Sequence, residues 1–94
     1  MNIRHALAAN IRSLRARKDI SQQEVADAMR ALGFTEWRRQ TLGSAEHGSR
    51  RVSIEELFGL ADVLGTTISQ LVDPSPNGTV FFPNEQEVVS RVLL

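Results

Sequence analysis

The chain has 94 residues, of which 41% are hydrophobic, and this fits one small domain with a core that needs no covalent staples. It has no cysteine, which excludes a disulfide framework and a thiolate metal site. No run approaches the roughly 18 to 20 apolar residues of a membrane span. We therefore expect a soluble, cytoplasmic protein without membrane partners. The zero net charge conceals two opposed halves, because residues 1–51 carry ten Lys/Arg against five Asp/Glu and residues 52–94 carry one against six, or +5 and −5.

Apolar residues at helical spacing predict two helices in the first third of the chain. The stretch 3–18 is the first, with inward residues Leu7, Ile11 and Leu14. SQQE at 21–24 is a capping box, in which the serine hydroxyl and the glutamate carboxylate each bond the amide of the other residue. It opens a second helix that Gly33 ends. The expected inward residues of this helix are Val25, Ala28, Met29 and Leu32.

A connection and a short third helix follow. FTEW at 34–37 links the helices, and the third helix runs from Arg39 to about Glu46, closed by Gly48 in a left-handed turn. Its inward residues are Leu42 and Ala45. Trp37, just before this helix, either fills the core or stacks on a base or sugar, and we favour the core.

Two more capping boxes predict the last helices. SIEE at 53–56 opens a fourth helix that ends at Gly65, and TISQ at 67–70 opens a short fifth helix that Asp73 and Pro74 stop. The apolar face of the fourth helix comprises Ile54, Leu57, Phe58, Ala61 and Leu64, and that of the fifth comprises Ile68, Leu71 and Val72. Five helices with short connections predict an all-α domain over residues 1–73.

Residues 74–94 have a different composition. PSPNG at 74–78 is rich in turn formers, TVFF at 79–82 has strand composition, and NEQEVVSRVLL at 84–94 suits a helix or a strand. This tail either packs back on the domain as core or joins two copies of the chain, and we favour a homodimer. The expected interface residues are Val80, Phe81, Phe82, Val88, Val89, Val92 and Leu93.

A capped helix followed by a second short helix is the helix-turn-helix arrangement, in which the second helix enters the major groove of DNA. The stretches LRARKDISQQEVADAM and RRQTLGSAEHGSRRVSIEELFGLADVLGTTISQLV resemble the lambda-repressor-like, XRE-type helix-turn-helix family. The resemblance covers roughly residues 7–73. It implies a five-helix domain that binds double-stranded DNA at a pseudo-palindromic operator and uses no cofactor.

The resemblance also implies which residues meet DNA. Gln22 matches a phosphate-contacting glutamine, and the start of the third helix supplies base contacts, for which arginine suits guanine and glutamine suits adenine. Ser44 suits either base, Thr41 meets phosphate or a thymine methyl, and the arginines after Gly48 contact the DNA backbone. The full expected DNA-binding set is Gln22, Arg38, Arg39, Gln40, Thr41, Ser44, Ser49, Arg50 and Arg51.

Three further features concern how the third helix is held. The resemblance pairs Arg15 with Glu46 as a structural ion pair. Twelve positions separate Arg30 from Leu42, so ALGFTEW lengthens the second helix or the turn, as in a subset of members that resemble actinobacterial regulators. Arg38 occupies the expected N-cap, where serine or threonine would cap better.

Other chemistry finds little support in the sequence. His5 and His47 lie far apart with no carboxylate at ligand spacing, so we expect no metal site. Ser44 and His47 lack a third orienting group, and the adjacent Glu55 and Glu56 lie on different sides of a helix, so we expect no enzyme.

We therefore expect a sequence-specific regulator of transcription that binds double-stranded DNA, and in particular a repressor, because blocking polymerase requires only occupancy of the site. The stretch 74–94 leaves no room for a ligand-binding or self-cleaving domain, which favours a stand-alone Cro-like or phage or prophage regulator. The alternative is an antitoxin whose tail binds a toxin.

Overall fold

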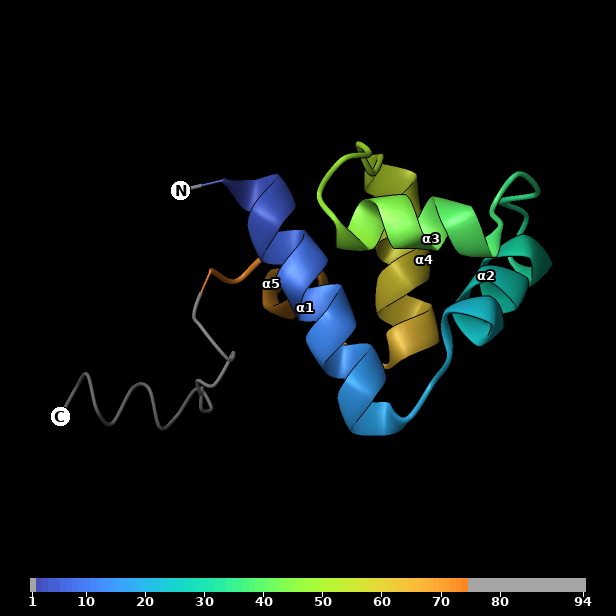
Figure 1. The fold of residues 1–94 in the computed structure, drawn as a ribbon, viewed down its shortest axis with the longest axis horizontal. Coiled ribbons are helices and arrows are strands. Elements are labelled where there is room, and N and C mark those ends of the chain that lie inside the picture. The colour runs from blue at the N-terminus through green and yellow to red at the C-terminus, as the bar shows by residue number, and fades with distance from the viewer. Residues whose placement is uncertain (1, 75–94) are drawn as a thin grey trace, which may run out of the picture.

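The computed structural model describes residues 2–74, which form five α-helices and no strand (Figure 1). The helices are α1 (Ile3–Lys18), α2 (Gln22–Ala31), α3 (Arg39–Glu46), α4 (Ile54–Leu64) and α5 (Ile68–Leu71). The predicted all-α class is confirmed. Everything expected of residues 75–94, including the strand or helix, the dimer interface and the toxin-binding tail, lies outside the described residues. No helix within 2–74 is long and apolar enough to cross a membrane.

Except for α3, the described helices begin where an N-cap side chain accepts from their first free amides. The capping boxes predicted at 21–24, 53–56 and 67–70 are all present, and in each the N-cap hydroxyl accepts from the N3 amide at 3.0–3.1 Å. At the other ends, Gly48 (φ +74°) adopts the predicted left-handed conformation, and Gly65, which was predicted to end α4, adopts it as well (φ +64°). A residue with a Cβ adopts this conformation only with strain.

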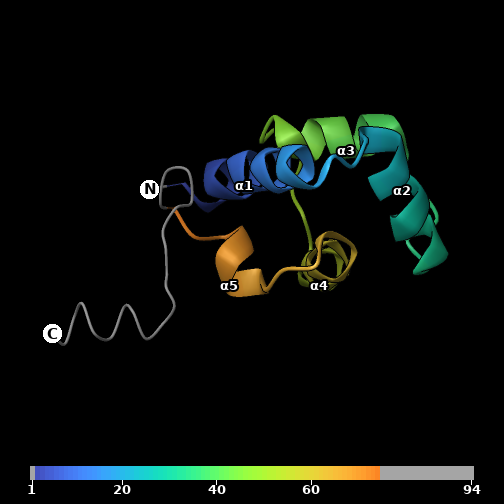
Figure 2. The same ribbon diagram turned by 90° about the horizontal axis from the view of Figure 1, so that it is seen from below.

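The helices form two layers. Figure 2 shows α1 and α3 side by side in one layer and α4 and α5 in the other, with α2 running from the first layer toward the second. Packing of α3 on both α1 and α2, and of α4 on α2 and α5, encloses one core. The core residues are Leu7, Ile11, Val25, Met29, Trp37, Leu42, Ala45, Leu60, Ala61, Leu64 and Leu71.

Two expectations about the apolar face of α4 are wrong. Ile54 and Phe58 are 60% and 63% exposed, although helical spacing placed them with the core. The reason is that α4 packs on both α2 and α5, which turns the face of Glu56, Gly59 and Leu60 inward. A sequence pattern reports which residues are apolar, whereas the neighbours decide which side is covered.

The end of α2 also differs from expectation. Leu32, predicted to point inward, is 47% exposed, Ala28 is only half-buried, and Ala26 is fully buried instead. The chain leaves the helix at Leu32 and turns through Gly33 (φ +108°), and the following Phe34 packs against the core. Phe34 therefore takes the place that periodicity assigned to Leu32.

α5 is short, and a side chain of α1 bonds the carbonyl groups at its C-terminal end. Asn10 Nδ2 lies 2.7 Å from the carbonyl oxygen of Leu71, 2.7 Å from that of Asp73 and 3.2 Å from that of Gln70. These carbonyls belong to the last turn of α5 and the residues after it, where a helix lacks amide partners of its own. Asn10 thus caps α5 from the other layer.

The two mid-helix glycines, Gly43 in α3 and Gly59 in α4, give opposite predictions. A Cβ at Gly59 would lie 2.8 Å from Phe34 Cε2 and 3.2 Å from Met29 Cε, so Gly59→Ala should lower the free energy of unfolding by about 1–3 kcal/mol. A Cβ at Gly43 would meet nothing closer than Gln22 Nε2 at 3.9 Å, so Gly43→Ala should raise it by about 0.5–1 kcal/mol through helix propensity. Urea unfolding of both variants measures the difference, and a loss of stability in both would contradict the packing described for α3.

Candidate nucleic-acid interface

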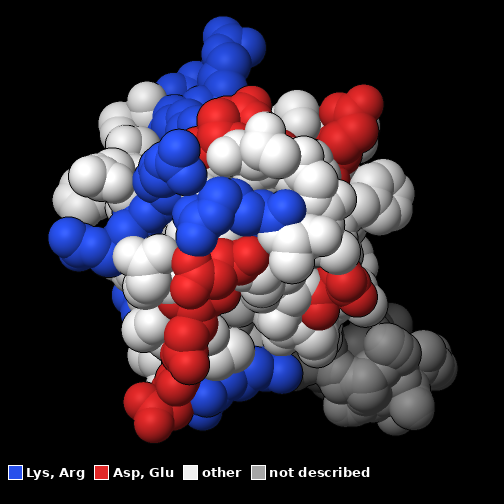
Figure 3. All heavy atoms as spheres, turned by 90° about the vertical axis from the view of Figure 1, so that its right-hand side faces the viewer, with Lys and Arg blue, Asp and Glu red and all other residues white. Residues whose placement is uncertain are grey.

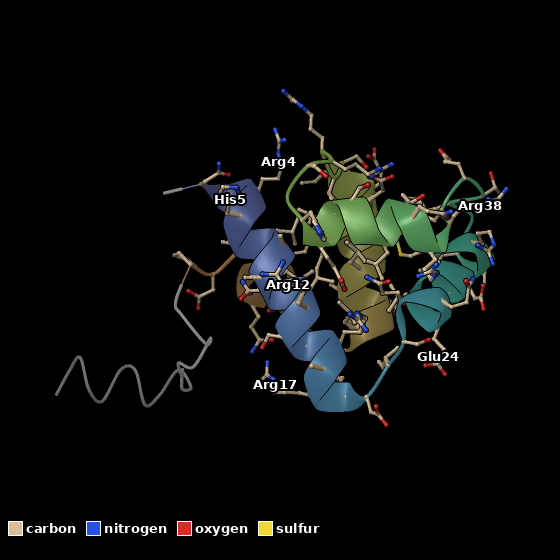
Figure 4. All side chains as sticks on the ribbon, viewed as in Figure 1. Arg4, His5, Arg12, Arg17, Glu24 and Arg38 are labelled. Carbon is tan, nitrogen blue, oxygen red and sulfur yellow. The ribbon has the colours of Figure 1, made fainter. Side chains whose placement is uncertain are left out.

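The first turn of α3 presents polar side chains to solvent. Arg38, Arg39 and Gln40 are exposed, and none of their side chains makes a hydrogen bond or ion pair within residues 2–74. Figure 4 shows Arg38 at the end of α3 that lies far from α1. In Figure 3, which views the molecule from the α2 side, Lys and Arg atoms gather in the upper part of the face, with Asp and Glu atoms beside and below them. The start of α3 therefore offers unpaired donors to an outside acceptor.

The start of α3 is capped in an unusual way. The Arg38 side chain makes no cap hydrogen bond within the described chain, as expected for an arginine at this position. Instead, Thr41 Oγ1 accepts from the Arg38 amide at 3.0 Å and donates to the Glu36 carbonyl at 3.4 Å. Thr41, predicted to meet DNA, is half-buried, and its hydroxyl is already engaged in shaping the helix start.

The other end of α3 is anchored through Glu46, which is only 3% exposed. Arg15 Nε lies 2.6 Å from Oε2, and Gln22 Nε2 lies 2.9 Å from Oε1. Arg12 also donates to the Glu46 carbonyl oxygen. α1 and α2 thus hold the last turn of α3 through one carboxylate. The Gln22 side-chain amide, expected to contact a phosphate, already donates one N–H to Glu46.

A second buried carboxylate, that of Glu56 on α4, holds the two chain segments that flank α3. Trp37 Nε1 donates to Oε2 at 2.9 Å, and Arg50 approaches both oxygens, at 3.1 and 3.2 Å. The Arg50 guanidinium also lies over the indole ring, 5.2 Å from its centroid. The Ser53 amide, 2.9 Å from Oε1, completes the set. Trp37 precedes the N-cap of α3 and Arg50 follows the helix, so both ends meet at Glu56.

Opposing effects act on the pKa of Glu56. Burial raises this pKa, but hydrogen bonds from Arg50, the Ser53 amide and Trp37, together with the positive charge of Arg50, outweigh burial and lower the pKa from 4.5 to about 2. Glu56 is therefore ionised at neutral pH, and its charge is matched within the fold.

The two arginines of the loop after α3 differ in whether their side chains are paired within the protein. Arg50 is 29% exposed in its side chain and is committed to Glu56, although it was expected at the DNA backbone. Arg51 is exposed and its side chain makes no hydrogen bond or ion pair among the described residues. The Ser49 hydroxyl donates to the Ser44 carbonyl at 3.2 Å, and Ser44 is half-buried.

The start of α1 lies against the end of α3. Arg4 Nη1 donates to the Gly48 carbonyl at 3.4 Å, and a Cβ at Gly48 would lie 3.0 Å from His5 Cδ2. Figure 4 places Arg4, His5 and Arg12 along α1 on the same side of the molecule. Basic side chains of α1 therefore approach one end of α3, while Arg38 and Arg39 occupy the other.

Sequence reasoning foresaw the exposed start of α3 but not the Glu56 network. Trp37 is fully buried, which confirms the core position and excludes stacking on a base in this conformation. Glu56 was recognised only as the fourth residue of the SIEE capping box and as the neighbour of Glu55, and no spacing rule signals that its carboxylate meets residues 37 and 50. Within residues 2–74, no three His, Asp or Glu side chains are grouped so as to hold a metal ion.

Comparison with known proteins gives consistent matches. A helix-turn-helix family model matches residues 11–71, most of the chain. Over 72 residues the chain is 32% identical to the control protein C.SmaI of Serratia marcescens, covering 77% of this chain and 79% of that protein. The crystal structure of the clp gene regulator ClgR from C. glutamicum has a TM-score of 0.68 at 27% identity, over 87% of this chain and 99% of that one. The DNA-binding domain of BldD has a TM-score of 0.60 at 30% identity, over 77% and 99%.

The lowered pKa of Glu56 predicts a pH dependence of stability. A carboxylate whose pKa falls from 4.5 in the unfolded chain to about 2 in the folded protein stabilises the fold above pH 4.5, and this contribution is lost as the pH falls toward 2. It amounts to about 3 kcal/mol. The stability difference between wild type and Glu56→Gln should therefore shrink as the pH is lowered from about 5 to about 2. Urea unfolding across this range measures it, and a constant difference would show that the carboxylate charge is not what Arg50 and Trp37 stabilise.

Proposed function

The chain belongs to the lambda-repressor-like, XRE-type helix-turn-helix family of DNA-binding transcriptional regulators, and from this premise we propose that it recognises a specific operator with the first turn of α3. The observation that carries the proposal is the state of Arg38, Arg39 and Gln40, which are exposed and without partners within residues 2–74. They stand at the start of a helix that Glu46 and Glu56 anchor at both ends. Free donors on a fixed helix are what base recognition in the major groove requires.

Within this proposal, the base-reading residues are Arg39 and Gln40. A guanidinium can form two hydrogen bonds with guanine, and a side-chain amide can do the same with adenine. Ser44 lies one turn further along the helix and is half-buried. Its hydroxyl would therefore reach a base only where α3 lies close to the floor of the groove.

The DNA backbone is contacted by residues on either side of the helix. Arg38 and Arg51 are exposed and supply positive charge, and Gln22 retains a side-chain oxygen and one N–H beside the start of α2. We assign Arg50 to the scaffold instead, because its guanidinium is held by Glu56 and stacked on Trp37.

Repression by occupancy of the operator is the simplest mode of action, and a cytoplasmic location follows from a DNA target. The matched proteins are named as a control protein, a gene regulator and a DNA-binding domain, which supports a regulator rather than an enzyme. The charge distribution along the sequence supports contact with DNA through the first half of the chain, since residues 1–51 carry a net charge of +5 and residues 52–94 one of −5.

We further propose that the protein acts as a homodimer joined through residues 79–94. One small domain buries little DNA surface, and a two-fold dimer would bind two half-sites spaced by one helical turn, about 34 Å. The material for such an interface is a set of apolar residues, namely Val80, Phe81, Phe82, Val88, Val89, Val92 and Leu93.

The base-reading and backbone-contacting roles are separable by mutation. Arg39→Ala or Gln40→Ala should weaken binding to the selected operator by about 1–3 kcal/mol and relax the preference at one base pair. Arg51→Ala should weaken operator and random DNA alike and reduce the slope of log affinity against log salt by about one unit. The operator is first obtained by selection from random duplexes, and fluorescence anisotropy over a range of salt concentrations measures each variant.

The matched control is Arg50→Met, which removes the Glu56 ion pair from the scaffold and should change the salt slope less than Arg51→Ala does. If Gln40→Ala lost affinity equally on operator and random DNA, the assignment of Gln40 to a base would fail.

Removal of residues 75–94 tests the dimer. The core described above closes between Leu7 and Leu71, so a chain ending at Pro74 should remain folded. It should sediment as a monomer and bind the operator more weakly, because two half-sites no longer bind as one unit. Sedimentation velocity of both chains at tens of micromolar decides the matter: a full-length monomer would refute the dimer, and an unfolded truncation would show that the tail is core.

A further inference from the structure

We propose that Glu56 is a positioning residue for DNA recognition. It holds Trp37 before α3 and Arg50 after it, and thereby sets the orientation of the first turn of α3. This turn carries Arg38, Arg39 and Gln40. The inference rests on the proposed function of α3. It concerns a residue on α4 that touches no DNA itself and acts only through its neighbours.

Trp37 is fixed from three directions. Its indole N–H donates to Glu56 on α4 at 2.9 Å, and its carbonyl oxygen accepts from Arg30 of α2 at 2.6 Å. Its amide donates to the Phe34 carbonyl at 3.0 Å, and its side chain is fully buried. Because Trp37 directly precedes the N-cap Arg38, the position of the indole decides where the first turn of α3 begins.

The start of α3 needs this support because its own sequence provides little. An arginine at the N-cap leaves the first amides without a side-chain acceptor from that residue. Besides the backbone bonds from the Thr41 and Leu42 amides to the Arg38 carbonyl, the Thr41 hydroxyl is the one side-chain group among the described residues that bonds the Arg38 amide. The connection from α2 is also long, with seven residues between Ala31 and Arg39. A long connection and a weak cap would let the N-terminal end of α3 move, whereas Glu46 already fixes the C-terminal end.

Arg50 links the far side of the helix to the same carboxylate. Its two terminal nitrogens approach both oxygens of Glu56, and its guanidinium lies over the Trp37 ring. The Arg50 guanidinium is planar, its edge is paired with the carboxylate at two points and its face lies on the ring, so it has few alternative geometries. The segments before and after α3 are therefore clamped together at α4.

Such a clamp matters more for reading bases than for binding phosphates. Base contacts require side chains within about 0.5 Å and 10–20° of the productive geometry. Contacts between flexible arginines and phosphates tolerate a small tilt of the helix. Loss of the clamp should therefore lower discrimination between operator and random DNA while leaving nonspecific affinity nearly unchanged.

The experiment compares Glu56→Gln, Trp37→Phe and Asn10→Ala in the full-length protein. Glu56→Gln removes the ion pair, and Trp37→Phe keeps an aromatic ring but removes the indole N–H. Asn10→Ala removes the three hydrogen bonds that cap α5, and so costs stability away from α3. Affinity for the selected operator and for random duplex is measured where unfolding curves show each variant to be folded. The amide shifts of residues 38–41 are recorded by NMR.

We expect the ratio of operator to random affinity to fall roughly tenfold in Glu56→Gln and Trp37→Phe, as for loss of one base contact, and to stay within about twofold of wild type in Asn10→Ala. The amide shifts at the start of α3 should move only in the first two variants. An unchanged ratio in both would overturn the positioning role, as would an equal fall in Asn10→Ala, which would point to stability alone. If Glu56→Gln does not fold, Trp37→Phe decides. A wild type that does not discriminate would instead overturn the proposed operator recognition, and this inference with it.

Discussion

A carboxylate taken out of water must be matched by cations and N–H donors, and this constraint governs the placement of the recognition helix. Glu46 and Glu56 are both buried, and each collects its partners from two other segments of the chain. Glu46 ties the end of α3 to α1 and α2, and Glu56 ties its two flanking segments to α4. An eight-residue helix, too short to be stable alone, thereby acquires a fixed position.

The same constraint decides which basic residues remain available to a polyanion. Arg15 and Arg50 neutralise the two buried carboxylates, and Arg30 bonds Asp27 and the Trp37 carbonyl, so their donors are used inside the protein. Arg39 and Arg51 have no such partner within residues 2–74. The basic half of the chain is therefore part scaffold and part surface, and the zero net charge of the whole chain conceals both parts.

The long connection between α2 and α3 supplies two of the contacts that fix α3 and α4 relative to each other. Its two aromatic residues do different work: Phe34 packs beside Gly59, where the absence of a Cβ lets α4 come close, and Trp37 combines a buried ring with a polar N–H that Glu56 accepts. The added length replaces a capping side chain at Arg38 with a tertiary anchor. What a short turn achieves by local bonding, this chain achieves through contacts with α4.

The sequence by itself determined the features that depend on near neighbours. The helix starts at Ser21, Ser53 and Thr67 and the left-handed glycines depend on residues within one turn, and the motif spacing indicated the exposed first turn of α3. Only the tertiary structure decided that Ile54 and Phe58 face solvent and that Arg50 belongs to Glu56. Those outcomes depend on which helices lie against α4, and the pairing of a buried charge across the fold leaves no periodic trace in the sequence.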